Sequence, residues 1–257
     1  MNLTERPSPL PFLRARFARD HYLGLPLTTG VLAVIASLSL FSLIAYAVMS
    51  AGDLIALDQR IADWFHLHAS ESRTLTLAVK AFTHWHGTIG ILTMSALLAL
   101  YMWRTRDWNW LLALWLTVPG GMLLNFGLKH VFQRLRPSFE QPILVLHSYS
   151  FPSGHSIGAA LFYALLAAWL INQPALTTRL RRAISRSPAS AAPMPGALIV
   201  TLAAAMTLLV GLSRMYLGAH FFSDVLAALL LGLGWFALCV TAVFTTRRHY
   251  SERVRSN

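Results

Sequence analysis

The chain has 257 residues, of which 56% are hydrophobic and only 12% charged, so it is too apolar for a soluble globular domain and is typical of an integral membrane protein. A net charge of +11 would suit a nucleic-acid-binding protein, but the basic residues flank apolar runs and form no stripe on a polar domain, so we expect no nucleic-acid partner. The single cysteine, Cys239, lies inside an apolar run and cannot form an intrachain disulfide.

Six uncharged runs approach or exceed the length needed to cross a bilayer, which is roughly 20 helical residues. Each is bounded by charged residues or by Pro and Gly, and the second and fourth runs are the shortest. The sequence therefore predicts an all-α polytopic membrane protein with six transmembrane helices in a single domain over residues 1–257. In chain order the runs cover residues 27–51, 87–103, 108–128, 156–173, 197–212 and 225–244.

The basic residues predict how these helices are oriented. If the N-terminus is cytoplasmic, 14 of the 21 Lys and Arg residues fall in cytoplasmic segments, as the positive-inside rule requires. We therefore expect a multi-pass protein of the cell (inner) membrane, with a basic arm (residues 1–26) and a tail (residues 245–257) in the cytoplasm. Of the remaining seven, four lie near the polar clusters described below: Lys129, Arg134, Arg136 and Arg214.

The outside loop over residues 52–86 carries an amphipathic pattern. Its apolar residues recur at helical spacing and its charged residues fall on the other face. This pattern predicts a helix that lies on the membrane surface or caps the bundle, followed by a second short helix over residues 75–82. The apolar face comprises Leu54, Leu57, Ile61, Trp64 and Phe65, and the polar face comprises Asp58, Arg60 and Asp63.

The same loop contains two His-x-His pairs, His66 with His68 and His84 with His86. A metal site is one interpretation. However, alternate residues of a helix point in different directions, and no cysteine or pair of carboxylates completes a ligand set. We therefore interpret these side chains as histidines of the membrane interface and expect no metal.

Three polar clusters border the apolar runs, and the expected topology puts all three on the outer side. Taken singly, each charged residue has an ordinary explanation, as a helix-end cation, an interfacial histidine or a helix N-cap. Together they gather three cations, two histidines and a carboxylate at one end of the bundle, which favours a shared function. The clusters are KHVFQRLRP at residues 129–137, PSGH at 152–155 and SRMYLGAHFFSD at 213–224.

The residue types in these clusters suit a phosphate. Lys129, Arg136 and Arg214 supply positive charge and many donors for a phosphoryl group whose charge is spread over its oxygens. At the start of the fourth helix, the backbone N–H groups of Ser153 and Gly154 would be free to point at an anion, and the Ser153 hydroxyl can donate one more hydrogen bond.

Two histidines can divide the work of phosphoryl transfer. His220 and Asp224 are four residues apart and share one face of a helix, so the carboxylate can hold the Nδ1 proton and leave Nε2 free as a nucleophile. His155, on the other side of the phosphorus, would protonate the leaving oxygen and then help water to break the phospho-histidine. No Walker-type loop, HExxH or aspartate-rich motif occurs, so we expect Lys and Arg to neutralise the charge without a cofactor.

The three motifs K-x6-R-P, P-S-G-H and S-R-x5-H-x3-D, in this order, resemble the signature of the type 2 phosphatidic acid phosphatase (PAP2) family, the membrane relatives of vanadium haloperoxidases. Every signature position is filled between residues 128 and 224. The resemblance implies a six-span helical bundle and metal-independent hydrolysis. It implies as nucleophile His220, as its orienting residue Asp224, as acid His155, and as phosphate ligands Lys129, Arg136, Ser153, Gly154 and Arg214.

The motifs indicate only how the phosphate is bound and cleaved, and they do not specify which lipid carries it. Bacterial members of the family act on undecaprenyl pyrophosphate, phosphatidylglycerol phosphate, phosphatidic acid or lipid A. An outward-facing site in a compact chain resembles the members that act on undecaprenyl pyrophosphate or phosphatidylglycerol phosphate, and of these two we expect undecaprenyl pyrophosphate. A phosphotransferase that uses the same histidine is an alternative. A haloperoxidase is disfavoured because the family's members of that kind are soluble, and a lipid or ion transporter because the ionisable residues cluster at one membrane face.

Overall fold

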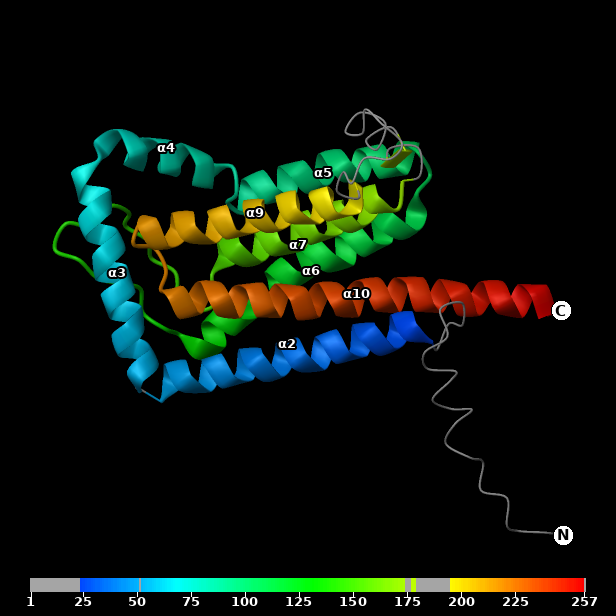
Figure 1. Ribbon diagram of the computed structural model, residues 1–257, viewed down its shortest axis with the longest axis horizontal. Helices are drawn as coiled ribbons and strands as arrows, with labels where there is room; N and C mark the ends of the chain where they lie inside the picture. Colours follow the sequence, from blue (N-terminus) through cyan, green and yellow to red (C-terminus); the bar gives the residue numbers. More distant parts are fainter. Residues whose placement is uncertain (1–23, 51, 174–176, 179–194, 257) are drawn as a thin grey trace, which may run out of the picture.

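The computed structural model describes residues 24–50, 52–173, 177–178 and 195–256, with side chains up to Arg247. Every regular element within these ranges is a helix, which confirms the predicted all-α fold. The helices of the bundle lie side by side along one direction (Figure 1). They are α2 (Leu25–Met49), α5 (Thr88–Arg104), α6 (Trp108–Phe132), α7 (Gly154–Ile171), α9 (Pro195–Tyr216) and α10 (Phe222–Ser256). Two further helices, α3 (Asp53–Glu71) and α4 (Arg73–His84), lie at one end of this bundle.

The predicted spans correspond to observed helices. Five helices, α2, α6, α7, α9 and α10, are long and apolar enough to cross a membrane. The shorter α5 makes a sixth span when it is joined to α4, although the two are bent by 47°. Most of the predicted cytoplasmic arm lies outside the described residues, as does residue 51 of the first run. The last helix, α10, continues through the predicted tail to Ser256.

The helix α7 lies at the centre of the bundle, in contact with α5, α6, α9 and α10. Its side chains Ile157, Leu161 and Leu165 are fully buried. Large apolar side chains cover the outside of the bundle, as expected of a surface that faces lipid; Ile89 is 83% exposed and Leu123 71%. The first turn of α7 is thereby fixed against its neighbours, at the end of the bundle where the polar clusters meet.

The predicted amphipathic helix is α3, which lies across this end of the bundle (Figure 1). The prediction of its faces is wrong for Asp58, which is fully buried, and for Leu57 and Trp64, which are exposed, while Arg60 and Asp63 are exposed. The side toward the bundle carries Asp58 with two small residues, Ala62 and Ala69. Since a polar site lies beneath α3, the helix turns one charge, Asp58, inward and leaves some of its large apolar side chains on the outside.

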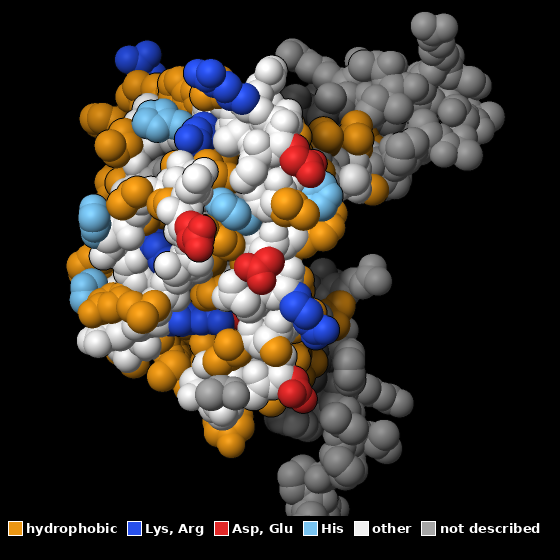
Figure 2. All heavy atoms as spheres, turned by 90° about the vertical axis from the view of Figure 1, so that its left-hand side faces the viewer, with side chains coloured by type: hydrophobic (Ala, Val, Ile, Leu, Met, Phe, Trp, Pro, Cys, Tyr) orange, Lys and Arg blue, Asp and Glu red, His pale blue; other side chains and the backbone are white. Residues whose placement is uncertain are grey.

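The predicted second helix is α4, which extends beyond the predicted residues 75–82 at both ends. Ser72 caps its N-terminus, and its hydroxyl accepts a hydrogen bond of 3.4 Å from the backbone of Leu75. Thr76 shares a 3.2 Å hydrogen bond with the Tyr216 hydroxyl, which ties α4 to the end of α9. Figure 2 shows this end of the molecule, where cationic, acidic and histidine side chains lie among apolar ones.

Candidate active site

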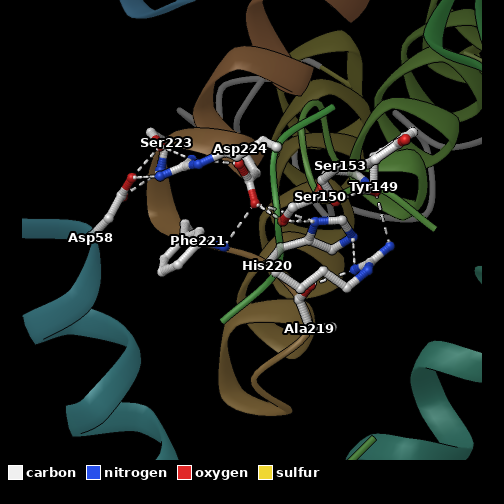
Figure 3. Close-up of polar contacts among 12 residues, drawn as sticks. Asp58, Tyr149, Ser150, Ser153, Ala219, His220, Phe221, Ser223 and Asp224 are labelled. Atoms are coloured by element: carbon white, nitrogen blue, oxygen red, sulfur yellow. Dashed lines mark hydrogen bonds and ion pairs between the residues drawn. The ribbon is translucent and has the colours of Figure 1, made fainter. Parts of the chain in front are cut away.

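His220 lies in the short segment between α9 and α10 and is only 3% exposed. Its Nδ1 is 3.4 Å from Asp224 Oδ2 and 3.4 Å from Ser150 Oγ (Figure 3). Its Nε2 is 3.2 Å from Nη1 of Arg136. Because a guanidinium can only donate, Nε2 accepts this bond and the ring proton resides on Nδ1, facing the carboxylate. This is the tautomer that the proposed nucleophile requires.

The turn that brings His220 to Asp224 differs from the prediction. His220 precedes α10, so the two residues do not share a helix face. Instead α9 ends in a Schellman motif, in which Gly218 N donates to Met215 O at 3.0 Å and Ala219 N donates to Arg214 O at 2.9 Å. Gly218 has a φ of +66°, a conformation that favours glycine.

The start of α10 completes this turn. The carboxylate of Asp224, in the first turn of the helix, accepts a 2.9 Å bond from the Phe221 backbone N–H, as in a capping box. The same oxygen, Oδ2, lies toward His220 Nδ1. The helix start therefore fixes the carboxylate in front of the imidazole.

Burial controls the protonation of His220. Loss of hydration, helped by the nearby charges of Arg136 and Lys129 and opposed by Asp224, lowers its pKa from 6.5 to about 3. The imidazole is therefore neutral near pH 7 and keeps a lone pair on Nε2.

Asp224 is held by a chain of buried charges. Its Oδ1 accepts a 2.6 Å bond from Arg134, and the other end of that guanidinium donates at 2.7 Å to Asp58 of α3. Ser150 also donates to Asp224 Oδ2. Asp58 in turn accepts from the backbone N–H of Ser223 at 2.9 Å and from its hydroxyl. Both carboxylates are fully buried, so the arginine neutralises and orients them together.

Two of the predicted phosphate ligands hold the loop that leads to α7. Lys129 donates to the carbonyls of Tyr149 at 2.5 Å and Ser150 at 3.2 Å. Arg136 donates to the carbonyls of Ser148 at 2.7 Å and Tyr149 at 3.2 Å. Burial lowers the pKa of Arg136 below its ordinary value, and Asp224 opposes the shift. Both cations thus point their donors toward the space beside His220.

The third predicted cation, Arg214, lies in the last turn of α9 and is 4% exposed. Its Nη1 donates to the Thr83 hydroxyl at 3.3 Å, and its Nε has no partner among the described residues. A buried guanidinium with unused donors is ready to bind an anion.

The start of α7 departs from one expectation. Ser153 is the N-cap, and its hydroxyl accepts bonds from Ser156 N at 3.5 Å and Ser156 Oγ at 2.9 Å. The prediction that its backbone N–H is free is wrong, because this group donates to Asp224 O at 3.1 Å and so ties α7 to α10. A Cβ added at Gly154 would lie 3.9 Å from Cε of Lys129, so the first residue of the helix lies beside that cation.

His155 follows in the first turn of α7. Its titratable neighbours are Arg214, His220, Arg136 and His86. With Arg214 it lines a pocket of about 700 Å³. The structure therefore brings all eight predicted site residues to one end of the bundle.

Comparison with known proteins identifies the family. The sequence model of the PAP2 superfamily matches residues 108–248, more than half of the chain. The chain belongs to this family. Phosphatidylglycerophosphatase B of Bacillus subtilis (strain 168) is 31% identical over 203 residues, which cover 79% of this chain and 91% of that protein. The crystal structure of a transmembrane PAP2-type phosphatidylglycerolphosphate phosphatase from Bacillus subtilis superimposes with a TM-score of 0.67 at 28% identity, covering 80% of this chain and 93% of that one.

This PAP2 protein is thus a membrane phosphatase, as its sequence motifs predict.

Three residues of the site could not be predicted from the sequence. The sequence indicates Arg134 only as a cation near the first motif. The helical spacing of Asp58 predicts a place on the polar face of an amphipathic helix. Ser150 lies in a loop without regular structure and carries no signal in the sequence.

The His-x-His pairs of this phosphatase have other partners. His86 is 6% exposed, and its Nδ1 and Nε2 bond to Phe82 O at 2.9 Å and to the Tyr163 hydroxyl at 2.8 Å. His66 stacks on the ring of Phe139. Within the described residues, no three His, Cys, Asp or Glu side chains are grouped as a metal site would need.

Proposed function

We propose that this phosphatase cleaves the phosphomonoester of a membrane lipid through a phospho-histidine formed on His220, at the outer face of the membrane. The observation that carries the proposal is the neutral, buried imidazole, with Nδ1 directed at Asp224 and Nε2 accepting from Arg136. Such an imidazole is both oriented and nucleophilic.

In the first step Arg136 turns its donor from Nε2 of His220 to the phosphate, and the released Nε2 lone pair forms a bond to phosphorus while the bond from phosphorus to the lipid oxygen breaks. The leaving oxygen keeps that electron pair and takes a proton from His155. In the second step His155 removes a proton from water, the water oxygen attacks phosphorus, and the electron pair of the N–P bond returns to His220. Free phosphate is the product.

The charge of the phosphoryl group would be neutralised by Lys129, Arg136 and Arg214. Lys129 and Arg136 donate hydrogen bonds to the carbonyls of residues 148–150, within reach of the space beside His220. Fixed cations in a site of low dielectric are effective in phosphoryl transfer because they need no reorganisation as the charge develops. We therefore expect hydrolysis that does not depend on a divalent ion.

For the substrate we propose phosphatidylglycerol phosphate. The name of the Bacillus relative and its coverage of most of both chains support this choice over undecaprenyl pyrophosphate, the substrate expected from the sequence. For the side of the membrane, the charges support an outer site. The helix α5 ends at Arg104, and this helix end lies at the opposite end of the bundle from the turn between α9 and α10 (Figure 1).

The experiment measures phosphate release from phosphatidylglycerol phosphate in detergent micelles, with and without EDTA. We expect EDTA to leave the rate unchanged and His220→Ala to lower it at least ~1,000-fold. His68→Ala is the matched control, since this exposed histidine of α3 forms its hydrogen bond within its own helix, to Trp64 O, in the part of the chain that the structure describes.

Rapid quench with radiolabelled substrate tests the intermediate directly. Acid-labile label should appear on the wild-type protein and be absent from His220→Ala. The proposal fails if EDTA stops the reaction or if no labelled protein forms. Label transferred to an acceptor lipid, without free phosphate, would identify a phosphotransferase instead.

A further inference from the structure

The pocket beside His155 and Arg214 is lined by polar residues on one wall and by large apolar residues elsewhere. Its volume is about 700 Å³, and it extends from these two residues along α4 and the start of α5. One wall is polar, with Lys80, Thr83 and His84 of α4. The apolar part of the lining comprises Trp85, Ile89, Leu144 and Leu146.

The position of His155 determines what this pocket receives, if the proposed function is correct. His155 gives a proton to the leaving oxygen, so the leaving group must lie on the side of the phosphorus that His155 faces. His220 attacks from the opposite side and does not line the pocket. The lipid part of the substrate therefore occupies this pocket, with its alkyl chains toward Trp85 and Ile89, which are 66% and 83% exposed.

Lys80 is placed at a defined distance from the phosphate site. It shares one face of α4 with Thr83 and His84, three and four residues further on. Thr83 accepts the 3.3 Å bond from Arg214, so it marks the position of the phosphate-binding guanidinium. Lys80 therefore begins about 5 Å, roughly one helical turn, from that point.

The Lys80 side chain is half-buried. Within the described part of the chain it forms no ion pair. A half-buried lysine without a counter-ion, in a pocket that contains an arginine, creates a site that attracts an anion.

We propose that Lys80 binds a second anionic group of the substrate, one helical turn from the phosphate that is cleaved. The substrate class is a lipid whose terminal phosphomonoester is separated from a phosphodiester by a three-carbon bridge, as in phosphatidylglycerol phosphate. A lipid pyrophosphate does not fit, because its two phosphorus atoms share one oxygen and both lie at Arg214. Phosphatidic acid has no second phosphate for Lys80.

Three substrates test the proposal in mixed micelles: phosphatidylglycerol phosphate, phosphatidic acid and undecaprenyl pyrophosphate. The variant is Lys80→Gln, and Lys80→Arg should restore the charge. For phosphatidylglycerol phosphate we expect kcat/KM of Lys80→Gln to fall roughly tenfold, the effect of one charged hydrogen bond. For the other two lipids we expect less than about a twofold change.

The control variant is Arg73→Gln, at the exposed first residue of the same helix and outside the pocket lining. It removes the same charge about 10 Å along the axis, so it should change none of the three rates more than about twofold. Equal melting temperatures for the variants show that α4 keeps its fold.

The outcomes separate the subsite from the function on which it rests. A wild-type protein that hydrolyses none of the lipids refutes the proposed function itself. If the wild type is active, but Lys80→Gln slows the hydrolysis of all three lipids equally or of none, only the Lys80 subsite is refuted. The largest loss on undecaprenyl pyrophosphate would also overturn it, because the second anion would then lie next to the first.

Discussion

The buried chain Asp58–Arg134–Asp224 predicts that Arg134→Met destabilises the protein strongly. Arg134 binds the two carboxylates at 2.7 Å and 2.6 Å, its side chain is 10% exposed, and both carboxylates are fully buried. Removing one partner of a buried ion pair costs about 3–5 kcal/mol, because a charge is left uncompensated. Since one guanidinium serves two carboxylates here, we expect a loss of about 4 kcal/mol or more in the free energy of unfolding.

The variant Asp58→Asn should cost less, about 2–3 kcal/mol. Arg134 keeps Asp224 as a partner, but an amide can accept on only one side. Asp58 now accepts from Ser223 N at Oδ1 and from Arg134 at Oδ2, so one of these donors would face the amide N–H₂. In the double variant the cation and one carboxylate leave together, and the total loss should be smaller than the sum of the two by about 1–2 kcal/mol.

Denaturant titration of the micelle-embedded protein measures these free energies, and phosphate release measures the site. In Arg134→Met that remains folded, kcat should fall more than KM changes, because Oδ1 of Asp224 loses its bond to Arg134 while the proposed phosphate ligands stay in place. Asp63→Asn, on the exposed side of α3, is the control and should lie within about 0.5 kcal/mol of the wild type. Strict additivity, or wild-type stability of Arg134→Met, would refute the buried-charge reasoning.

Two further predictions concern the nucleophile and its turn. Because burial lowers the pKa of His220 to about 3, protonation of this imidazole should not lower kcat/KM between pH 7 and 5. With a nucleophile of pKa 6.5, kcat/KM would fall about tenfold by pH 5.5. A pH–rate profile that follows the higher pKa contradicts the burial argument. Gly218→Ala places a Cβ 2.9 Å from the Phe139 ring at a φ of +66°, so thermal unfolding should show a loss of about 1–2 kcal/mol and activity should fall. Gly127→Ala, where a Cβ meets nothing within 4 Å, should be neutral or stabilising, and an equal loss there would show that the strain argument is wrong.

The helices and the convergence of the motifs could be predicted because the membrane limits the alternatives. A backbone in lipid must satisfy its own hydrogen bonds, so each apolar run becomes a helix and consecutive runs alternate in direction. The polar ends of α6, α7, α9 and α10 then meet at one end of the bundle without any knowledge of packing. For the same reason the cations Lys129, Arg136 and Arg214 could be assigned to one site before their geometry was known.

The contacts between distant segments could not be predicted in this way. Asp58 and Arg134 are 76 residues apart, and nothing in the spacing of a single amphipathic helix reveals a partner on another segment. The turn at His220 depends on the Schellman motif at Gly218. The four-residue spacing of His220 and Asp224 predicts a helix instead, so this turn could not be predicted from the sequence. The pocket along α4 depends on the 47° bend between α4 and α5, which composition does not specify.

The burial of Asp58 explains how α3 is held in register over the site. A helix at the end of a membrane bundle gains little from apolar packing against a polar site, and its large apolar side chains, such as Trp64, face outward. Directional bonds must therefore fix its position. Because Asp58 accepts from the Ser223 backbone as well as from Arg134, a shift of α3 by one residue would break contacts to both α10 and the loop after α6. The same contacts that dock α3 thus orient the carboxylate of Asp224, so the site is fully ordered only when its covering helix is in place.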